Sequence, residues 1–298
     1  MKEKFVVTIP VYKSGNTKLL NYVSEINCNT LIVPQISSVR TDPSSLAYHI
    51  NQKYNKSVII TINTVDTNLR FIQSRILGAE LFKLNNFLIT KGDAKSLQKS
   101  LIKQTKDSKA VFEHTATNVM NSIKQMNKGY DFIGNKLESN TECVFGSTIE
   151  INQTDKEYLN LINKKIKLGS SYLVSNPIYD GKMYKKFVTK FNKSFSKKIN
   201  IPIYVSIRMN LPNDSFFDQN YHTYKNNFQS NKLNAYIELF TSLNNVGVKN
   251  YNLILFDNNN ADKKTLKEQV LMANKLIRFS KWNFLYFKIV FSAQMHNN

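Results

Sequence analysis

The chain has 298 residues, of which 42% are hydrophobic and 12% aromatic. This composition can bury a full core and argues against a chain that is disordered by composition. Its two cysteines, Cys28 and Cys143, form no C-x-x-C pair, which argues against a disulfide framework or a cysteine zinc site. The 41 basic and 21 acidic residues are spread along the chain, without the clustering that a nucleic-acid surface requires.

Short runs of β-branched and aromatic residues recur along the chain, most of them about 28 residues apart, close to the step of a parallel barrel. Near-continuous apolar runs of this length are typical of a parallel sheet that is buried on both faces. The runs are Phe5–Ile9, Leu31–Val33, Val58–Ile62, Phe87–Thr90, Cys143–Ser147, Tyr172–Ser175, Ile203–Ile207 and Tyr251–Phe256.

Helical patterns fill the intervals between these runs. Apolar residues recur at three- and four-residue spacing over residues 69–79 and 233–243, which places them on one helix face. Asp42-Pro43 offers an N-cap followed by a proline at the first helical position. Thr154–Glu157 is a capping-box pattern that opens a helix ending at Leu168.

Eight alternations of strand and helix predict an α/β fold, a single (β/α)8 TIM barrel domain over residues 1–298. A doubly wound open sheet is the alternative. The two long intervals follow the fourth and seventh runs and are interpreted as insertions. The most polar interval, around residues 94–141, is one of them.

In this fold the catalytic groups come from strand C-termini and from the loops that follow them. No histidine holds such a position, so a histidine-ligated metal site or a Ser-His-Asp triad is disfavoured and we expect no metal. The polar residues at those positions are Thr8, Gln35, Asp66, Lys91, Asp93, Glu150, Asn176, Asp180, Arg208 and Asp257.

Lys91-Gly92-Asp93 is the most informative of these clusters, because it directly follows an apolar run. Gly92 would let a planar ligand approach the backbone, the Asp93 carboxylate could tune a bound ring, and Lys91 could face an anionic group. A simple turn is the alternative interpretation, since Gly-Asp commonly follows a strand. Arg208 likewise lies either where barrels hold phosphate or in a solvated salt bridge.

The run Leu69–Asp93, LRFIQSRILGAELFKLNNFLITKGD, resembles a segment of the methylenetetrahydrofolate reductases, in which a Gln-Ser-x-Leu-Leu-Gly-Ala helix leads into a strand ending in Gly-Asp. Lys165–Gly169 and Ser175–Asp180 are similar to the family's Lys-Val-x-Ala-Gly and Thr-Gln-Pro-Val-Tyr-Asp segments. Ser44–Ala47 resembles the start of its second helix. The ordered set covers most of residues 5–258.

The resemblance implies a flavoprotein oxidoreductase of one-carbon metabolism and methionine biosynthesis. Such an enzyme carries FAD across the strand C-termini and passes hydride from NAD(P)H through the flavin to methylenetetrahydrofolate, making methyltetrahydrofolate. By this resemblance Asp93 is the catalytic carboxylate near the flavin ring and the folate. Thr8 and Asn176 would bind the folate. The FAD would be held by Thr61, Lys91, Gly92, Asp93 and Lys165.

The first strand of that family ends in a glutamate that acts as general acid, whereas Thr8 aligns best there in this chain. Loss of a positioned acid slows a reaction by about 10²–10⁴-fold, and Glu150 or Asp66 is the hypothesis for a replacement. One alternative is a catalytically impaired barrel that binds folate, flavin or a partner without turnover. Another is a Schiff-base lyase that uses Lys91 as its nucleophile.

The net charge of +20 has two interpretations. It attracts anions such as the FAD pyrophosphate or the glutamate tail of a folate. Equally, abundant Lys, Asn, Ile, Tyr and Phe are what drift in an A/T-rich gene produces. No apolar run approaches the length of a membrane span and the start does not resemble a signal peptide. We therefore expect a cytoplasmic protein with a folate substrate, no membrane or nucleic-acid partner, and possible homo-oligomers.

Overall fold

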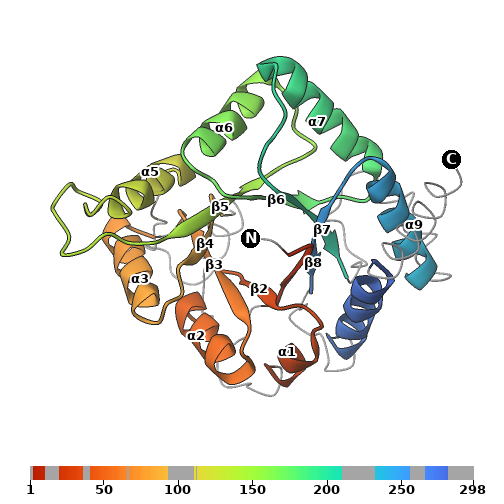
Figure 1. The fold of residues 1–298 in the computed structure, drawn as a ribbon, viewed down its shortest axis with the longest axis horizontal. Helices are drawn as coiled ribbons and strands as arrows, with labels where there is room; N and C mark the ends of the chain where they lie inside the picture. Colours follow the sequence, from red (N-terminus) through yellow and green to blue (C-terminus); the bar gives the residue numbers. More distant parts are fainter. Residues whose placement is uncertain are drawn as a thin grey trace, which may run out of the picture.

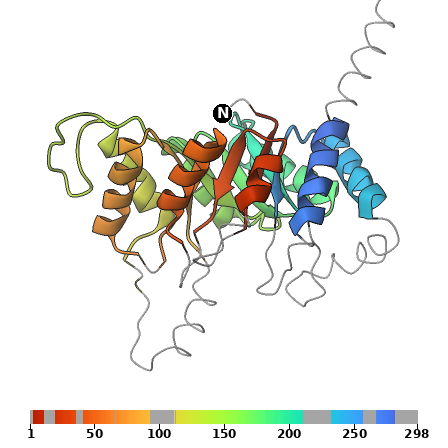
Figure 2. The same cartoon turned by 90° about the horizontal axis from the view of Figure 1, so that it is seen from below.

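Eight parallel strands close into a barrel in chain order in a computed structural model. β1 pairs with β8, so the sheet has no open edge. Figure 1 looks along the barrel and Figure 2 shows it from the side, with the helices forming an outer ring. The structure describes residues 3–10, 20–35, 41–65, 67–92, 111, 113–209, 232–255 and 266–280. The strands are β1 (Phe5–Thr8), β2 (Thr30–Val33), β3 (Ser57–Asn63), β4 (Asn86–Thr90), β5 (Val144–Ile149), β6 (Leu173–Pro177), β7 (Ile203–Arg208) and β8 (Asn250–Ile254).

The helices alternate with the strands and pack their apolar faces on the outside of the barrel. Within the described ranges, none of them is long and apolar enough to span a membrane. They are α1 (Asn21–Glu25), α2 (Pro43–Tyr54), α3 (Leu69–Leu81), α5 (Ala116–Met126), α6 (Lys156–Lys167), α7 (Gly181–Phe195), α9 (Lys232–Asn245) and a last helix over residues 266–280.

The predicted (β/α)8 barrel is confirmed, and each described strand end lies within two residues of its predicted position. Phe256, the predicted end of the last strand, lies outside the described residues. The predicted insertion around residues 94–141 is described in its second part, which contains α5 and a connection over residues 127–143.

Two helix starts show how local side chains set the boundaries. Asp42 caps α2, because its carboxylate accepts hydrogen bonds from the backbone N–H groups of Ser44 and Ser45, both at 2.9 Å. The expected cap of α6 is wrong by one residue. Asp155, not Thr154, accepts from the N–H of Tyr158 at 2.8 Å, and aspartate is at least as good an N-cap as threonine.

Alternate strand residues point outward to the helices and inward to the barrel axis. The outward residues join the helices in the large core, as Val7, Ile60 and Leu253 do. The inward residues of the N-terminal half form a separate apolar cluster. Its members are Val6, Ile32, Ile59, Leu88, Tyr172, Val174 and Tyr204.

The ring of Tyr172 can lie inside this cluster because Gly146 of β5 has no side chain. A Cβ on Gly146 would lie 2.2 Å from the Tyr172 ring. The Tyr172 hydroxyl passes β5, and its single proton is shared between two acceptors of β4, Asn86 Oδ1 and the Phe87 carbonyl, both at 2.9 Å. The ring of Tyr204 packs edge-on against it at 6.1 Å. Two tyrosine rings and five aliphatic side chains therefore fill the N-terminal half of the barrel.

We expect Gly146→Ala to lower the free energy of unfolding by about 1–3 kcal/mol, because the added methyl group overpacks the barrel interior. Gly78→Ala is the matched control, since a Cβ on Gly78 of α3 meets nothing within 4 Å. That change should raise the free energy of unfolding by about 0.5–1 kcal/mol through helix propensity. Urea unfolding measures the free energy of unfolding of both variants. An equal change in the two would contradict the close contact between Gly146 and Tyr172.

Candidate functional site

A layer of hydroxyl and amide side chains lies one step above the apolar cluster, toward the C-terminal ends of the strands. Thr8, Thr61, Thr90 and Ser206 each follow an inward residue of that cluster by two positions, so they face the barrel axis as well. Thr148 follows Gly146 in the same way. We call this set, together with Asn252, the polar layer. It lies at the end of the barrel where the sites of this fold are built.

One half of the polar layer is a chain of hydrogen bonds across four strands. Thr8 Oγ1 donates to Asn252 Oδ1 at 2.8 Å, and Asn252 Nδ2 donates to Ser206 Oγ at 3.0 Å. Ser206 Oγ in turn donates to the Ser175 carbonyl at 2.6 Å. Thr8, the expected folate contact, is therefore held toward β8 with its proton already donated.

The other half of the polar layer contains an unpaired hydroxyl. Thr148 Oγ1 donates to Thr90 Oγ1 at 3.1 Å. Thr61 is only 6% exposed, and its Oγ1 has no hydrogen-bond partner among the described residues. A buried polar group without a partner costs about 1–3 kcal/mol. A bound ligand that hydrogen-bonds to Thr61 would recover that free energy.

A cavity of about 490 Å³ adjoins the layer at Thr148. Its walls come from the C-terminal ends of β3 to β5, from the start of α5 and from α6. Charged, hydroxyl and apolar side chains alternate around it. The lining residues are Thr64, Val65, Lys91, Glu113, His114, Thr115, Ala116, Thr117, Thr148, Ile149, Glu150, Tyr158, Leu161 and Lys165.

Lys165 is the buried charge of this cavity. It is 7% exposed, and its Nζ donates to the Thr148 carbonyl at 2.7 Å. Burial lowers the pKa of Lys165 to about 8, and the nearby Glu150 carboxylate opposes the shift. An ammonium group has three protons, so one is used by the backbone and two remain for the cavity.

Glu150 is held at the rim by two neighbours. Its backbone N–H donates to the Tyr158 hydroxyl at 2.5 Å, and its carboxylate accepts a hydrogen bond from the Gln153 side chain. Burial raises the pKa of Tyr158 to about 12, so this hydroxyl keeps its proton at neutral pH. The cavity therefore combines a buried amine, a phenol and a carboxylate.

The turn after β4 packs on a neighbouring strand. Gly92 has a φ of +77°, a conformation that favours glycine, and a Cβ there would lie 3.3 Å from Asn63 Cγ. Asn63 Nδ2 donates to the Gln35 carbonyl at 2.8 Å. Lys91 is exposed and lines the cavity. Asp93, the expected catalytic residue, lies outside the described part of the chain.

Asn176 at the end of β6 holds the loop after β5. Its Oδ1 accepts from the N–H of Ile151 at 2.8 Å, and its Nδ2 lies 3.4 Å from Asn152 Oδ1. The amide that was expected to bind folate therefore fixes the position of a neighbouring loop. A ligand would compete with Asn152 for the Nδ2 donor.

The structure thus groups the expected residues in two adjoining places. Lys91 and Lys165 share the cavity with Glu150, and Thr8 and Thr61 lie in the polar layer. Sequence reasoning missed Glu113, His114 and Tyr158, which belong to helix starts and not to strand ends. Thr115 could have revealed Glu113 and His114 in the sequence, because a threonine is a common N-cap. It caps α5 by accepting from the Asn118 N–H at 3.2 Å, and the residues just before this cap lie at the barrel mouth.

No protein-family model and no curated protein matches this sequence. Among solved structures, the chain is similar to an uncharacterized protein from Clostridium thermocellum that binds two copies of 5-methyl-5,6,7,8-tetrahydrofolic acid. The TM-score is 0.58 at 12% sequence identity, and the alignment covers 91% of this chain and 94% of the other. At this identity the likeness shows a shared fold.

We expect Lys165 to contribute stability that increases with pH between about 8 and 10.5, the folded and ordinary pKa values of its ammonium group. In this window the unfolded chain binds a proton at Lys165 that the folded chain has released, so unfolding becomes less favourable as the pH rises. Lys165→Met lacks this contribution, whereas opposing contributions, such as that of the raised pKa of Cys143, are common to wild type and variant. Urea unfolding at both ends of the window measures the change in the free energy of unfolding of each protein. An equal change in wild type and variant would contradict this role of Lys165.

Proposed function

We propose that the chain binds a reduced folate at the C-terminal mouth of its barrel. The observation that carries this proposal is the buried Thr61 hydroxyl, which lacks a hydrogen-bond partner among the described residues and lies in a layer of hydroxyls and amides. The pterin ring of a folate is flat and has hydrogen-bond donors and acceptors along its edge. Hydroxyl and amide side chains match either kind of group.

The cavity beside the polar layer suits the remainder of such a ligand. The glutamate tail of a folate is anionic, and Lys91 and Lys165 contribute positive charge to the cavity wall. The net charge of +20 favours the approach of an anion. The Clostridium thermocellum protein with this fold binds a reduced folate, which supports the proposal by analogy of fold.

A FAD-dependent methylenetetrahydrofolate reductase is the finer form of this proposal, with NAD(P)H as the hydride donor. Bound FAD would supply the hydride transfer. In this form the unpaired Thr61 hydroxyl and the two remaining protons of Lys165 would contact the flavin in place of the folate, with Lys91 and Gly92 at the edge. Proton delivery would fall to Glu150, which lines the cavity, because Thr8 is not an acid and its hydroxyl donates to Asn252.

A folate-binding barrel without turnover is the second candidate. The observation that favours it is the hydrogen-bonded Thr8 at the end of β1, where the resemblance implies a glutamate general acid. Both candidates bind folate at the barrel mouth, and they differ in whether flavin also binds there and hydride moves.

For folate binding, we expect Thr61→Val to raise the Kd for 5-methyltetrahydrofolate roughly 3- to 10-fold, the effect of one lost hydrogen bond. The same change should leave the ligand-free protein at least as stable, because it removes an unpaired polar atom. Ser147→Ala is the matched control. The Ser147 hydroxyl is equally buried and unpaired, but it lies between Phe145 and Ile149 of the outer core.

Calorimetric titration measures the affinity and urea unfolding measures the stability of the two variants. A stability loss in Thr61→Val with unchanged affinity would show that the hydroxyl has a structural role only.

For the reductase, we expect the protein to retain added FAD through gel filtration. Reduced nicotinamide should bleach the flavin absorbance and methylenetetrahydrofolate should restore it. Glu150→Gln should slow the folate-dependent step by about 10²–10⁴-fold without changing FAD retention, and Asp93→Asn should slow it too. Glu157→Gln is the control, because Glu157 is exposed on α6 and does not line the cavity. If no FAD is retained but folate still binds, the candidate without turnover stands.

A further inference from the structure

Exposed apolar side chains gather on one side of the barrel. Of the nine large hydrophobic residues that the described ranges leave exposed, six lie on α2, on α3 and the residue after it, and on the connection over residues 127–143. Leu81 is 82% exposed and Ile133 is 71% exposed, although such side chains are normally buried. The six are Tyr48, Phe71, Leu81, Phe82, Tyr130 and Ile133.

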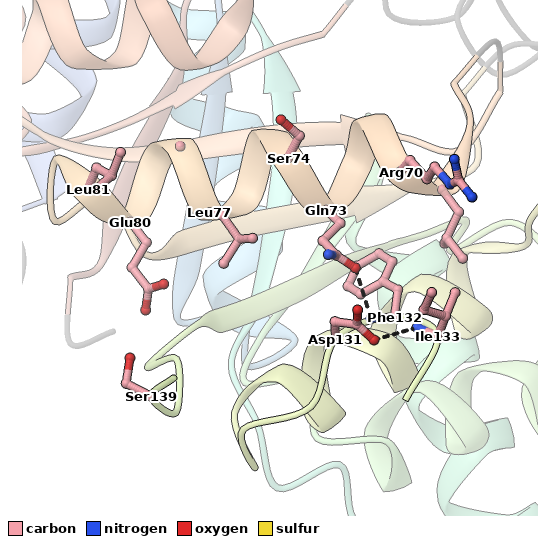
Figure 3. A pocket seen from close by; sticks show the side chains of 12 residues that line it. Arg70, Gln73, Ser74, Leu77, Glu80, Leu81, Asp131, Phe132, Ile133 and Ser139 are labelled. Carbon is pink, nitrogen blue, oxygen red and sulfur yellow. Dashed lines mark hydrogen bonds between the residues drawn. The ribbon is translucent and has the colours of Figure 1, made fainter. Parts of the chain in front are cut away.

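A groove of about 940 Å³ runs along this face between α3 and residues 131–139. Figure 3 shows Leu77 of α3 pointing into it, with Phe132 and Ile133 on the opposite wall. Hydrogen bonds hold that wall in place. Gln73 Oε1 accepts from the N–H of Phe132 at 2.8 Å, and Asp131 Oδ1 accepts from the N–H of Ile133 at 3.0 Å. The groove is therefore preformed.

Opposite charges mark the two ends of the groove. Arg70 lies at one end and Glu80 at the other (Figure 3), about 15 Å apart along the helix axis. Neither forms an ion pair within the described part of the chain. Arg75 is already paired with Asp42 at 2.8 Å. With Asp131, the groove thus has one basic and two acidic side chains, on a chain of net charge +20.

The middle of α3 is open to a second helix. Ser74 and Gly78 line the groove, and a Cβ on Gly78 would meet nothing within 4 Å. Two copies of α3 can pair in antiparallel orientation about a two-fold axis that passes at the level of Arg75. Antiparallel pairing of two such helices sets Leu69 against Leu81, Arg70 against Glu80, and Gln73 against Leu77. A two-fold axis always relates contacts in this reciprocal way.

We propose that this face binds a second copy of the chain, with α3 antiparallel to the α3 helix of the partner subunit. Each Arg70 then faces Glu80 of the partner subunit, so the interface contains the charge pair twice. The exposed Leu81 and Ile133 side chains become buried. The near-neutral groove lets the two copies meet where the repulsion between basic surfaces is smallest.

Sedimentation of the full chain, at physiological ionic strength, tests the pairing through charge reversal. The screening length there is about 8 Å, so the net charge does not dominate. Wild type should be a dimer. Arg70→Glu and Glu80→Arg should each weaken the dimer at least about tenfold, because each sets like charges together twice. The double variant should restore it.

Both reversals favour the helix dipole, because they place an acid near the start of the helix and a base near its end. Glu80→Arg also removes the acceptor of the Glu142 N–H, which lies 3.3 Å from Glu80 Oε1, so urea unfolding of each variant shows that it is folded. Leu81→Ser should also weaken the dimer. Leu271→Ser is its control, since Leu271 is 48% exposed on the helix over residues 266–280, across the barrel from α3 (Figure 1).

Three outcomes would overturn the proposal. They are a wild-type chain that stays monomeric at high micromolar concentration, a dimer that Arg70→Glu leaves unchanged, and a double variant that fails to restore the dimer. None of them bears on folate binding, which is measured separately.

Discussion

The close packing of Tyr172 against Gly146 divides the barrel interior into two halves. A closed parallel sheet points one residue in two at its axis, and those side chains must fill the space at near-crystalline density. Here one ring reaches across β5 to hydrogen-bond with β4, and a second aromatic ring packs on its edge. The N-terminal half is filled in this way, and the hydroxyl and amide side chains of the polar layer lie beyond it, toward the mouth.

The mouth is consequently polar, and it is not fully satisfied by its own residues. The hydrogen-bond chain from Thr8 to Ser175 uses the groups on one side, whereas Thr61 on the other side has no partner among the described residues. Lys165 is buried with one of its protons bonded to the backbone. The unpaired hydroxyl and the buried ammonium group both lower the free energy of unfolding of the ligand-free protein. Unfavourable features of this kind are expected where a ligand binds.

The strands were predictable because parallel strands that are buried on both faces consist of nearly continuous apolar residues. The run Ile203–Ile207, for example, differs from β7 by one residue. The α6 cap could not be assigned between Thr154 and Asp155 from residue preference alone. Strand-end reasoning found Lys91 and Glu150, but it overlooked His114, whose position depends on how α5 packs beside β4. The commitment of the Asn176 amide to Ile151 depends on a loop geometry that spacing does not reveal.

A crystal structure of the chain with 5-methyltetrahydrofolate would test the central claim most directly. We expect electron density for the pterin ring at the C-terminal mouth, with a ring nitrogen or oxygen within hydrogen-bonding distance of Thr61 Oγ1 and the tail directed along the cavity that contains Lys165. Density for the folate only at another surface, or a mouth that stays without ligand at saturating folate, would contradict it.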